Sequence, residues 1–104
     1  MIEFDIKIQV DDNYLDDIID IAIEGGINYW AEEVIVFTPM SENNGKVFIM
    51  DIEGDGHEIT REELIKAIQT FIDNNPEIDT LEDPDAGVAD AIVQIAVFGE
   101  VVYG

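Results

Sequence analysis

The chain of 104 residues contains no cysteine and very few cationic side chains. The absence of cysteine excludes disulfide bonds and metal sites built on thiolates. Only four residues are Lys or Arg, against 25 Asp and Glu, so the formal net charge is -21 at pH 7. Proteins that bind nucleic acid or anionic membranes need cationic surface. We therefore expect no direct contact with nucleic acid or membrane, and a basic protein as the partner.

The chain also lacks the motifs of common enzymes and of exported proteins. Residues 1–5 show no basic segment leading into an apolar run, so we expect no signal peptide and a cytoplasmic location. The longest apolar stretch is interrupted by Asp90, Gln94 and Glu100, which argues against a membrane span. No P-loop, G-x-S-x-G, H-E-x-x-H or G-x-G-x-x-G is present, and the single histidine, His57, has no evident partner. We expect neither enzymatic activity nor a cofactor.

What the chain has is enough apolar sequence to fold, with 47% hydrophobic residues at the length of one domain. Apolar residues alternate over residues 2–10 and predict one half-buried strand. Helical spacing predicts a helix from Asp11 or Asp12, either of which can cap it, to about Glu24, where Gly25-Gly26 ends it. The first quarter of the chain therefore reads as a strand followed by a helix.

The remainder reads as a hairpin followed by two helices. Turn residues 39–45 separate two strand-like segments, and a short strand is expected at 57–59. Thr60 and Glu63 form a capping box for a helix that ends before Pro76. Asp83 is the expected cap of a third, mostly apolar helix to about Phe98. The predicted fold class is α+β: one domain (1–104), three helices, a small antiparallel sheet from the N-terminal strand and the hairpin around 34–52, and a buried C-terminal helix.

Acidic residues recur along the first predicted helix. Asp12, Asp16 and Asp20 are four residues apart, and Asp17 and Glu24 continue at helical spacing. Like charges one turn apart, at about 5–6 Å, repel each other and do not stabilise a helix. A binding role would explain them; a solvated face or adaptation to high salt would also produce such a composition. The predicted partner-binding residues are Asp12, Asp16, Asp17, Asp20, Glu24, Glu32 and Glu33.

One loop imitates a calcium-binding EF-hand. Asp51, Glu53, Asp55 and Glu62 occupy positions 1, 3, 5 and 12 of that motif, with a glycine at position 6. However, Glu58 stands at position 8 where the motif has an aliphatic residue, and the preceding residues resemble a strand instead of the entering helix. We therefore predict an acidic turn and no metal site; the same four carboxylates are the candidates for a weak one.

Two stretches, EGGINYW (24–30) and ADAIVQIAVFGEVVYG (89–104), are similar to small proteins encoded by phages and prophages, mostly without assigned function. The resemblance implies a viral accessory protein acting in the host-cell cytoplasm. In size and charge the chain also resembles anti-restriction and anti-CRISPR inhibitors, which block cationic DNA-binding surfaces. Trp30, the only tryptophan, is expected in the core, whereas Tyr29 and Tyr103 are the aromatic residues expected to reach a surface.

Together these features predict a phage-type anti-defence protein, an anti-CRISPR or DNA mimic, that binds a basic nucleic-acid-binding protein of a host defence system and blocks its access to DNA. The alternative is a non-enzymatic phage accessory module that binds calcium through residues 51–62 or acts by self-assembly, for example as a homodimer through Tyr29 and Trp30. A small enzyme with a carboxylate site is a third, weaker hypothesis.

Overall fold

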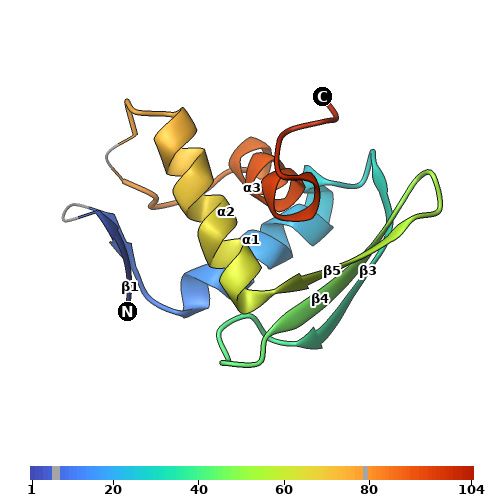
Figure 1. The fold of residues 1–104 in the computed structure, drawn as a ribbon, viewed down its shortest axis with the longest axis horizontal. Helices are drawn as coiled ribbons and strands as arrows, with labels where there is room; N and C mark the ends of the chain where they lie inside the picture. The colour runs from blue at the N-terminus through green and yellow to red at the C-terminus, as the bar shows by residue number, and fades with distance from the viewer. Residues whose placement is uncertain (6–7, 79) are drawn as a thin grey trace.

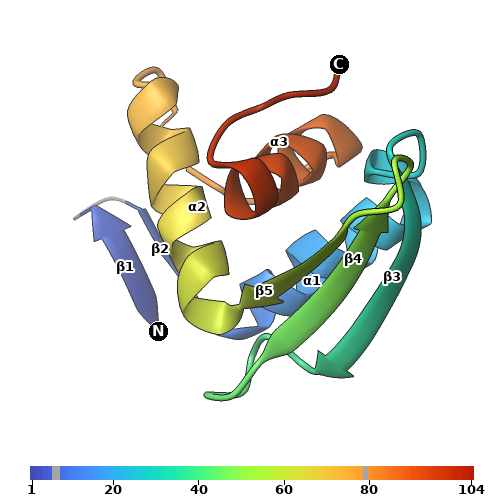
Figure 2. The same cartoon turned by 45° about the vertical axis from the view of Figure 1, so that its right-hand side comes forward.

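Three antiparallel strands form the sheet on which the helices pack. The structure, a computed structural model, describes residues 1–5, 8–78 and 80–104. All three helices lie on one side of this sheet, and a separate two-stranded sheet lies beside α2 (Figure 1, Figure 2). The predicted α+β class with three helices is confirmed. In chain order the elements are β1 (Ile2–Asp5), β2 (Ile8–Val10), α1 (Asn13–Ile21), the π-helical turn η1 (Ala22–Gly26), β3 (Ala31–Thr38), β4 (Lys46–Asp51), β5 (Gly56–Thr60), α2 (Arg61–Asn74) and α3 (Ala86–Phe98).

The N-terminal segment is a hairpin, so the prediction of one strand over residues 2–10 is wrong. β1 and β2 pair antiparallel, with Ile2 opposite Val10 and Glu3 opposite Gln9. The alternating pattern did not reveal the reversal because Ile2 and Ile8 keep the same parity and are both buried on one face of the hairpin. The hairpin also forms its own sheet and does not join the larger one. Ile6 and Lys7, which the predicted strand included, lie outside the described residues.

The larger sheet has the order β3-β4-β5, which confirms the hairpin and the short third strand expected from the sequence. Val47 and Ile49 of β4 are fully buried on the face that the helices cover. Ile35 and Phe48 are opposite each other on the other face, and Ile35 is exposed. Since β3 has a neighbour on one side only, it is an edge strand of the described sheet.

Helix α1 buries one side and exposes the other. Its buried residues are Tyr14, Leu15, Ile18 and Ile19. Of the two candidate caps, Asp11 places a side-chain oxygen 2.8 Å from the backbone nitrogen of Asn13, which donates the hydrogen bond. The helix continues through η1 to Gly26, so the predicted end at the glycine pair is confirmed. At Gly26 an added Cβ would lie 3.0 Å from the carbonyl oxygen of Ala86, so the missing side chain lets η1 approach the start of α3.

Helices α2 and α3 begin with side-chain caps, and one of the two expected caps is wrong. The capping box of Thr60 and Glu63 is present in α2. In α3 the cap is Asp85, whose Oδ1 accepts a 2.8 Å hydrogen bond from the backbone of Val88. Asp83 instead has a φ of 52°, a left-handed conformation that the N-terminal cap of a helix does not adopt. Gly99 ends α3 in the left-handed region, directly after the expected end near Phe98.

The core fills the space between the sheet and the three helices. Burying one aliphatic or aromatic side chain contributes about 1.5–3 kcal/mol. Gln94 is the only fully buried polar side chain among the described residues, and it lies on α3. None of the helices in the described part of the chain combines the length and apolarity needed to cross a bilayer. The largest fully buried hydrophobic side chains include Trp30, Leu15, Ile18, Ile49, Leu64, Ile68 and Ile92.

The Thr60 cap is expected to contribute measurably to stability. Its Oγ1 accepts a 3.2 Å hydrogen bond from the backbone of Glu63, and the Glu63 carboxylate accepts a 3.0 Å bond from the backbone of Thr60. Thr60→Ala should lower the free energy of unfolding by about 1 kcal/mol. Urea denaturation followed by Trp30 fluorescence measures the change. Thr60→Ser keeps the hydroxyl and should stay near wild type; equal stability of all three proteins would contradict the cap.

Candidate functional site

The two stretches EGGINYW and ADAIVQIAVFGEVVYG meet in one hydrogen-bonded network. Asp90 of α3 accepts a 2.6 Å hydrogen bond from the Tyr29 hydroxyl and a 2.8 Å bond from the Trp30 indole nitrogen. Gln94, one turn further along α3, donates from Nε2 to Asp90 at 2.8 Å. Trp30 is fully buried and Tyr29 is exposed, as expected from the sequence. Trp30 therefore cannot be the exposed anchor of a self-assembly surface.

The same network holds the C-terminal segment against α3. The Gln94 Oε1 atom accepts hydrogen bonds of 2.7 Å from the backbone nitrogens of both Val102 and Tyr103. The ring of Tyr103 stacks on Trp30, with centroids 5.6 Å apart and planes 3° from parallel. We call Tyr29, Trp30, Asp90, Gln94 and Tyr103 the Gln94 clamp. The hydrogen bonds of the clamp connect residues of this chain to one another. The clamp therefore joins the start of β3, α3 and the C-terminal segment.

His57 does have a partner, contrary to the expectation from the sequence. Its Nε2 lies 2.9 Å from Oδ2 of Asp51, a carboxylate that is buried at the end of β4. The other oxygen of Asp51 accepts hydrogen bonds from the backbone nitrogens of Glu53 and Asp55. The hydrogen bond from His57, helped by these backbone bonds and opposed by burial, lowers the pKa of Asp51 below its ordinary value of 3.8. The EF-hand-like loop is thus a turn organised around one carboxylate.

The four candidate calcium ligands are not brought together as a metal site. Asp51 is occupied by His57 and the turn backbone, while Glu53 and Asp55 are exposed in the turn and Glu62 is exposed in the first turn of α2. In the described part of the chain, no group of three or more His, Cys, Asp or Glu side chains is arranged to hold a metal ion. The resemblance to an EF-hand therefore stops at the spacing of the residues.

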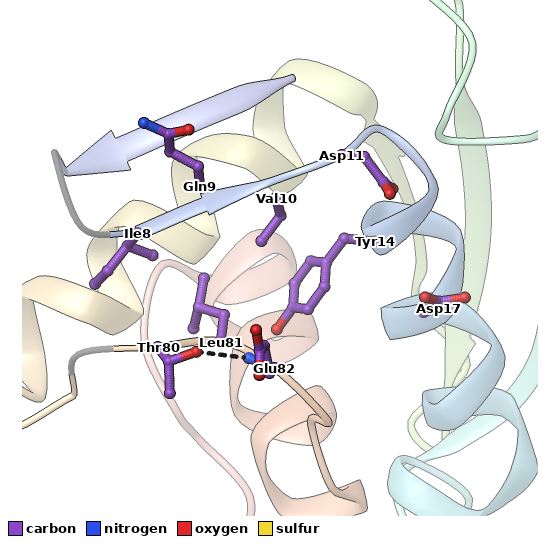
Figure 3. A pocket seen from close by; sticks show the side chains of 9 residues that line it. All are labelled: Ile8, Gln9, Val10, Asp11, Tyr14, Asp17, Thr80, Leu81 and Glu82. Atoms are coloured by element: carbon purple, nitrogen blue, oxygen red, sulfur yellow. Dashed lines mark hydrogen bonds between the residues drawn. The ribbon is translucent and has the colours of Figure 1, made fainter.

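Carboxylates do gather between α1 and residues 80–84. Two adjoining hollows of about 310 Å³ and 420 Å³ lie there, and both are lined by Tyr14 and Asp17. We call the pair the acidic groove; Figure 3 shows its first hollow. Among the described residues that line it there is no Lys, Arg or His. The lining residues are Ile8, Gln9, Val10, Asp11, Tyr14, Asp17, Thr80, Leu81 and Glu82 in the first hollow and Tyr14, Asp17, Asp20, Ile21, Glu24, Asp83 and Pro84 in the second.

Three of the seven predicted partner-binding residues line this groove. Asp17 and Asp20, on the exposed side of α1, and Glu24, in η1, form part of the groove wall. Asp11 was predicted only as a candidate helix cap, and Glu82 was not among the predicted partner-binding residues. Only the packing of residues 80–84 against α1 could add the opposite wall, and no local pattern predicts that packing.

The other four predicted residues lie outside the acidic groove. Asp12 contacts Arg61 at 3.3 Å, and Asp16 accepts a 3.3 Å hydrogen bond from the backbone of Ser41. Asp16 lines a separate hollow between α1 and the β3–β4 hairpin. Glu32 and Glu33 are exposed on β3 and line neither half of the groove. The predicted set is therefore divided between the groove, the rim of α1 and the sheet edge.

No family model, curated protein or solved structure matches this chain. The roles of its residues follow from their contacts alone. On that basis the Gln94 clamp gives residues 24–30 and 89–104 a structural role, whereas the exposed carboxylates Asp17, Asp20 and Glu24 of the acidic groove lie outside the core. The groove is the candidate functional site.

Gln94 should be necessary for the clamp. Gln94→Leu keeps the volume but removes both 2.7 Å bonds to the C-terminal backbone, so it should cost about 2 kcal/mol of unfolding free energy. It should also shift Trp30 emission to longer wavelength as Tyr103 leaves the indole. Chemical denaturation and fluorescence spectra measure both effects. Gln69→Leu, which removes one exposed bond to Asp73, is the matched control and should change neither.

Asp51 should make stability depend on acid pH. Because its folded pKa is below the ordinary 3.8, its contribution is complete above that value and is lost as the pH falls through the folded pKa. Asp51→Asn keeps the shape without the titration. The difference in unfolding free energy between wild type and Asp51→Asn should therefore shrink as the pH falls below about 4. A difference that grows on acidification would contradict the assignment.

Proposed function

We propose that this chain is a phage-type anti-defence protein that binds a basic nucleic-acid-binding protein of the host and blocks its access to DNA. One observation carries the proposal: the acidic groove gathers carboxylates from residues 11–24 and from residues 80–84 and has no cationic residue among its described lining. These carboxylates belong to Asp11, Asp17, Asp20, Glu24, Glu82 and Asp83.

Crowded carboxylates raise the free energy of the isolated protein, and a basic partner relieves that cost. DNA presents one charge per roughly 1.7 Å of its axis, so a surface that binds DNA carries closely spaced cations. A protein that holds carboxylates near one another can bind the same cationic side chains. On binding, the repulsion among the carboxylates is replaced by their attraction to the cations of the partner, and this favours the complex over the free protein.

The distribution of cations supports the same conclusion. Lys46 lies 3.7 Å from Glu58 on the sheet, and Arg61 joins Asp12 to the carbonyl oxygen of Met40, which it reaches at 2.9 Å. Both cations are thus paired outside the acidic groove. An acidic groove whose described lining holds no counter-ion attracts a basic partner over a Debye length, which is about 8 Å at physiological salt.

Self-association is a second candidate, and the edge strand favours it. Ile35, Val36 and Phe37 are exposed consecutively on β3, with Phe37 59% exposed. Edge strands with apolar residues pair with other chains. Glu32 and Glu33 on the same strand oppose pairing between two copies of charge -21. Light scattering on the purified chain and on Phe37→Ser decides this: a wild-type dimer that the substitution dissociates would favour self-association.

Neutralising the groove should remove the inhibition. Purified host-defence nucleases, both RNA-guided and restriction enzymes, are tested for DNA binding in the presence of the chain. We expect at least one to be inhibited, with association slowing steeply between roughly 0.05 and 0.5 M salt. The triple variant Asp17→Asn, Asp20→Asn, Glu24→Gln should associate at least tenfold more slowly, on the order of what electrostatic steering supplies.

The control carries the same change of charge elsewhere. Glu42, Glu53 and Glu100 are all exposed and outside the groove, so replacing the three with Gln should leave inhibition close to wild type. Equal loss in both variants would mean that total charge matters and the groove does not. Inhibition that is indifferent to salt, or no binding to any nuclease, would contradict the proposal.

A further inference from the structure

Tyr14 carries a buried hydroxyl that lacks a partner. The side chain is 8% exposed, and its oxygen is the only buried side-chain nitrogen or oxygen without a hydrogen bond among the residues that the structure describes. Native proteins rarely leave such an atom unsatisfied, because burial removes its bonds to water. The hydroxyl therefore marks a position where a group from outside the described chain would be favourable.

The hydroxyl faces the acidic groove. Tyr14 lines both hollows, and Figure 3 shows its ring extending from α1 toward Leu81 and Glu82 in the first of them. The facing wall has a defined shape, since the backbone of Glu82 donates a 3.2 Å hydrogen bond to the Thr80 hydroxyl. The Tyr14 oxygen is closed to solvent in the free protein, so an occupant of the hollow would reach it once the side chains over it move aside.

The lining of the first hollow selects a particular kind of ligand. Ile8, Val10 and Leu81 line one side with apolar side chains, of which Ile8 and Leu81 are buried. Asp17 and Glu82 offer exposed carboxylates on the other. A ligand that suits both has an alkyl stem and a cationic end, and its volume must fit within about 310 Å³. An anion would be repelled.

The protonation state of the Tyr14 hydroxyl narrows the choice of ligand further. Burial, and to a lesser degree the charge of Asp17, raise the pKa of Tyr14 to about 12. The hydroxyl is therefore neutral at physiological pH, and its oxygen can accept a hydrogen bond from a cationic N–H group. A guanidinium suits a partly buried acidic hollow better than an ammonium, because it is more weakly hydrated and presents five donors in one plane.

We infer that the hollow around Tyr14 binds a guanidinium group on an alkyl stem, supplied by an arginine side chain of the basic partner. The Tyr14 oxygen accepts one N–H, Asp17 and Glu82 balance the charge, and the stem lies along Ile8, Val10 and Leu81. That a partner arginine supplies the guanidinium rests on the proposed function, whereas the preference of the hollow for a guanidinium does not.

The chemistry is tested with a small probe on the intact chain. Butylguanidinium chloride is titrated while the NMR signals of the Tyr14 ring and of the backbone at residues 80–82 are followed. Wild type should show saturable shifts, and Tyr14→Phe should bind roughly tenfold more weakly, as expected for one hydrogen bond to a charged group. Tyr103→Phe removes a hydroxyl outside the hollow and should bind like wild type. Unsaturable shifts, or equal binding by wild type and Tyr14→Phe, would overturn the inference.

A measurement on the free protein separates a binding role from a structural one. If the hydroxyl has no internal partner, Tyr14→Phe removes an unsatisfied group, and the midpoint of denaturation should stay the same or rise. A clear fall in the midpoint would mean that the hydroxyl already bonds within the fold, and the inference would fail.

The inhibition assay distinguishes the source of the guanidinium. If a partner arginine fills the hollow, Tyr14→Phe should inhibit the nuclease roughly tenfold more weakly than wild type does. Weaker probe binding with unchanged inhibition would overturn the partner arginine and leave a free alkylguanidinium as the ligand. A third outcome is that the groove triple variant loses inhibition while Tyr14→Phe keeps both inhibition and probe binding. That outcome would uphold the proposed function and reject the inference. Probe binding through Tyr14 without inhibition of any nuclease would reject the function and keep the chemistry of the hollow.

Discussion

One buried amide fixes the arrangement of this fold. Gln94 uses both ends of its side chain: the oxygen holds the C-terminal backbone at Val102 and Tyr103, and the nitrogen holds Asp90. The other side chains of α3, apart from Asp90, are apolar, so they do not by themselves select one rotation of the helix about its axis. Because a buried amide must satisfy its donors and acceptors, only one rotation of α3 is acceptable. That rotation also aims Asp90 at Trp30 and so sets where β3 begins.

The buried core stabilises the folded state, whereas the charged surface destabilises it. Carboxylates in the acidic groove repel one another and have no cation beside them among the described lining residues. The folded state must therefore be held by its buried apolar residues and by the Gln94 clamp against a charge that favours expansion. Proteins commonly retain such destabilising surfaces where binding requires them. The ordinary composition of the core and the extreme composition of the surface are consistent with that division.

Local patterns predicted the elements well, and tertiary contacts account for what they missed. The capping box at Thr60, the end of η1 at Gly26 and the hairpin of β3 and β4 each depend on residues close in sequence. The reversal between β1 and β2 was missed because alternation continues through it, and the cap of α3 was misplaced because Asp83 and Asp85 both precede the helix. Neighbouring residues alone could not decide either case.

The candidate site was only half predictable for the same reason. Helical periodicity was sufficient to select Asp17, Asp20 and Glu24 as one exposed face. The facing wall and the unsatisfied hydroxyl of Tyr14 depend on how residues 80–84 pack against α1. In the sequence, Tyr14 is one more apolar position of an amphipathic helix.

The missing side chain at Gly26 has a consequence for how the groove would bind. Because η1 approaches the carbonyl of Ala86 so closely, the backbone that leads from the wall at Asp83 into α3 is held near the end of α1. Walls positioned by main-chain contact do not have to close around a ligand, so little conformational entropy is lost on association. Such a preorganised groove would form its encounter complexes without a folding step, and related partners would differ mainly in how long they stay bound.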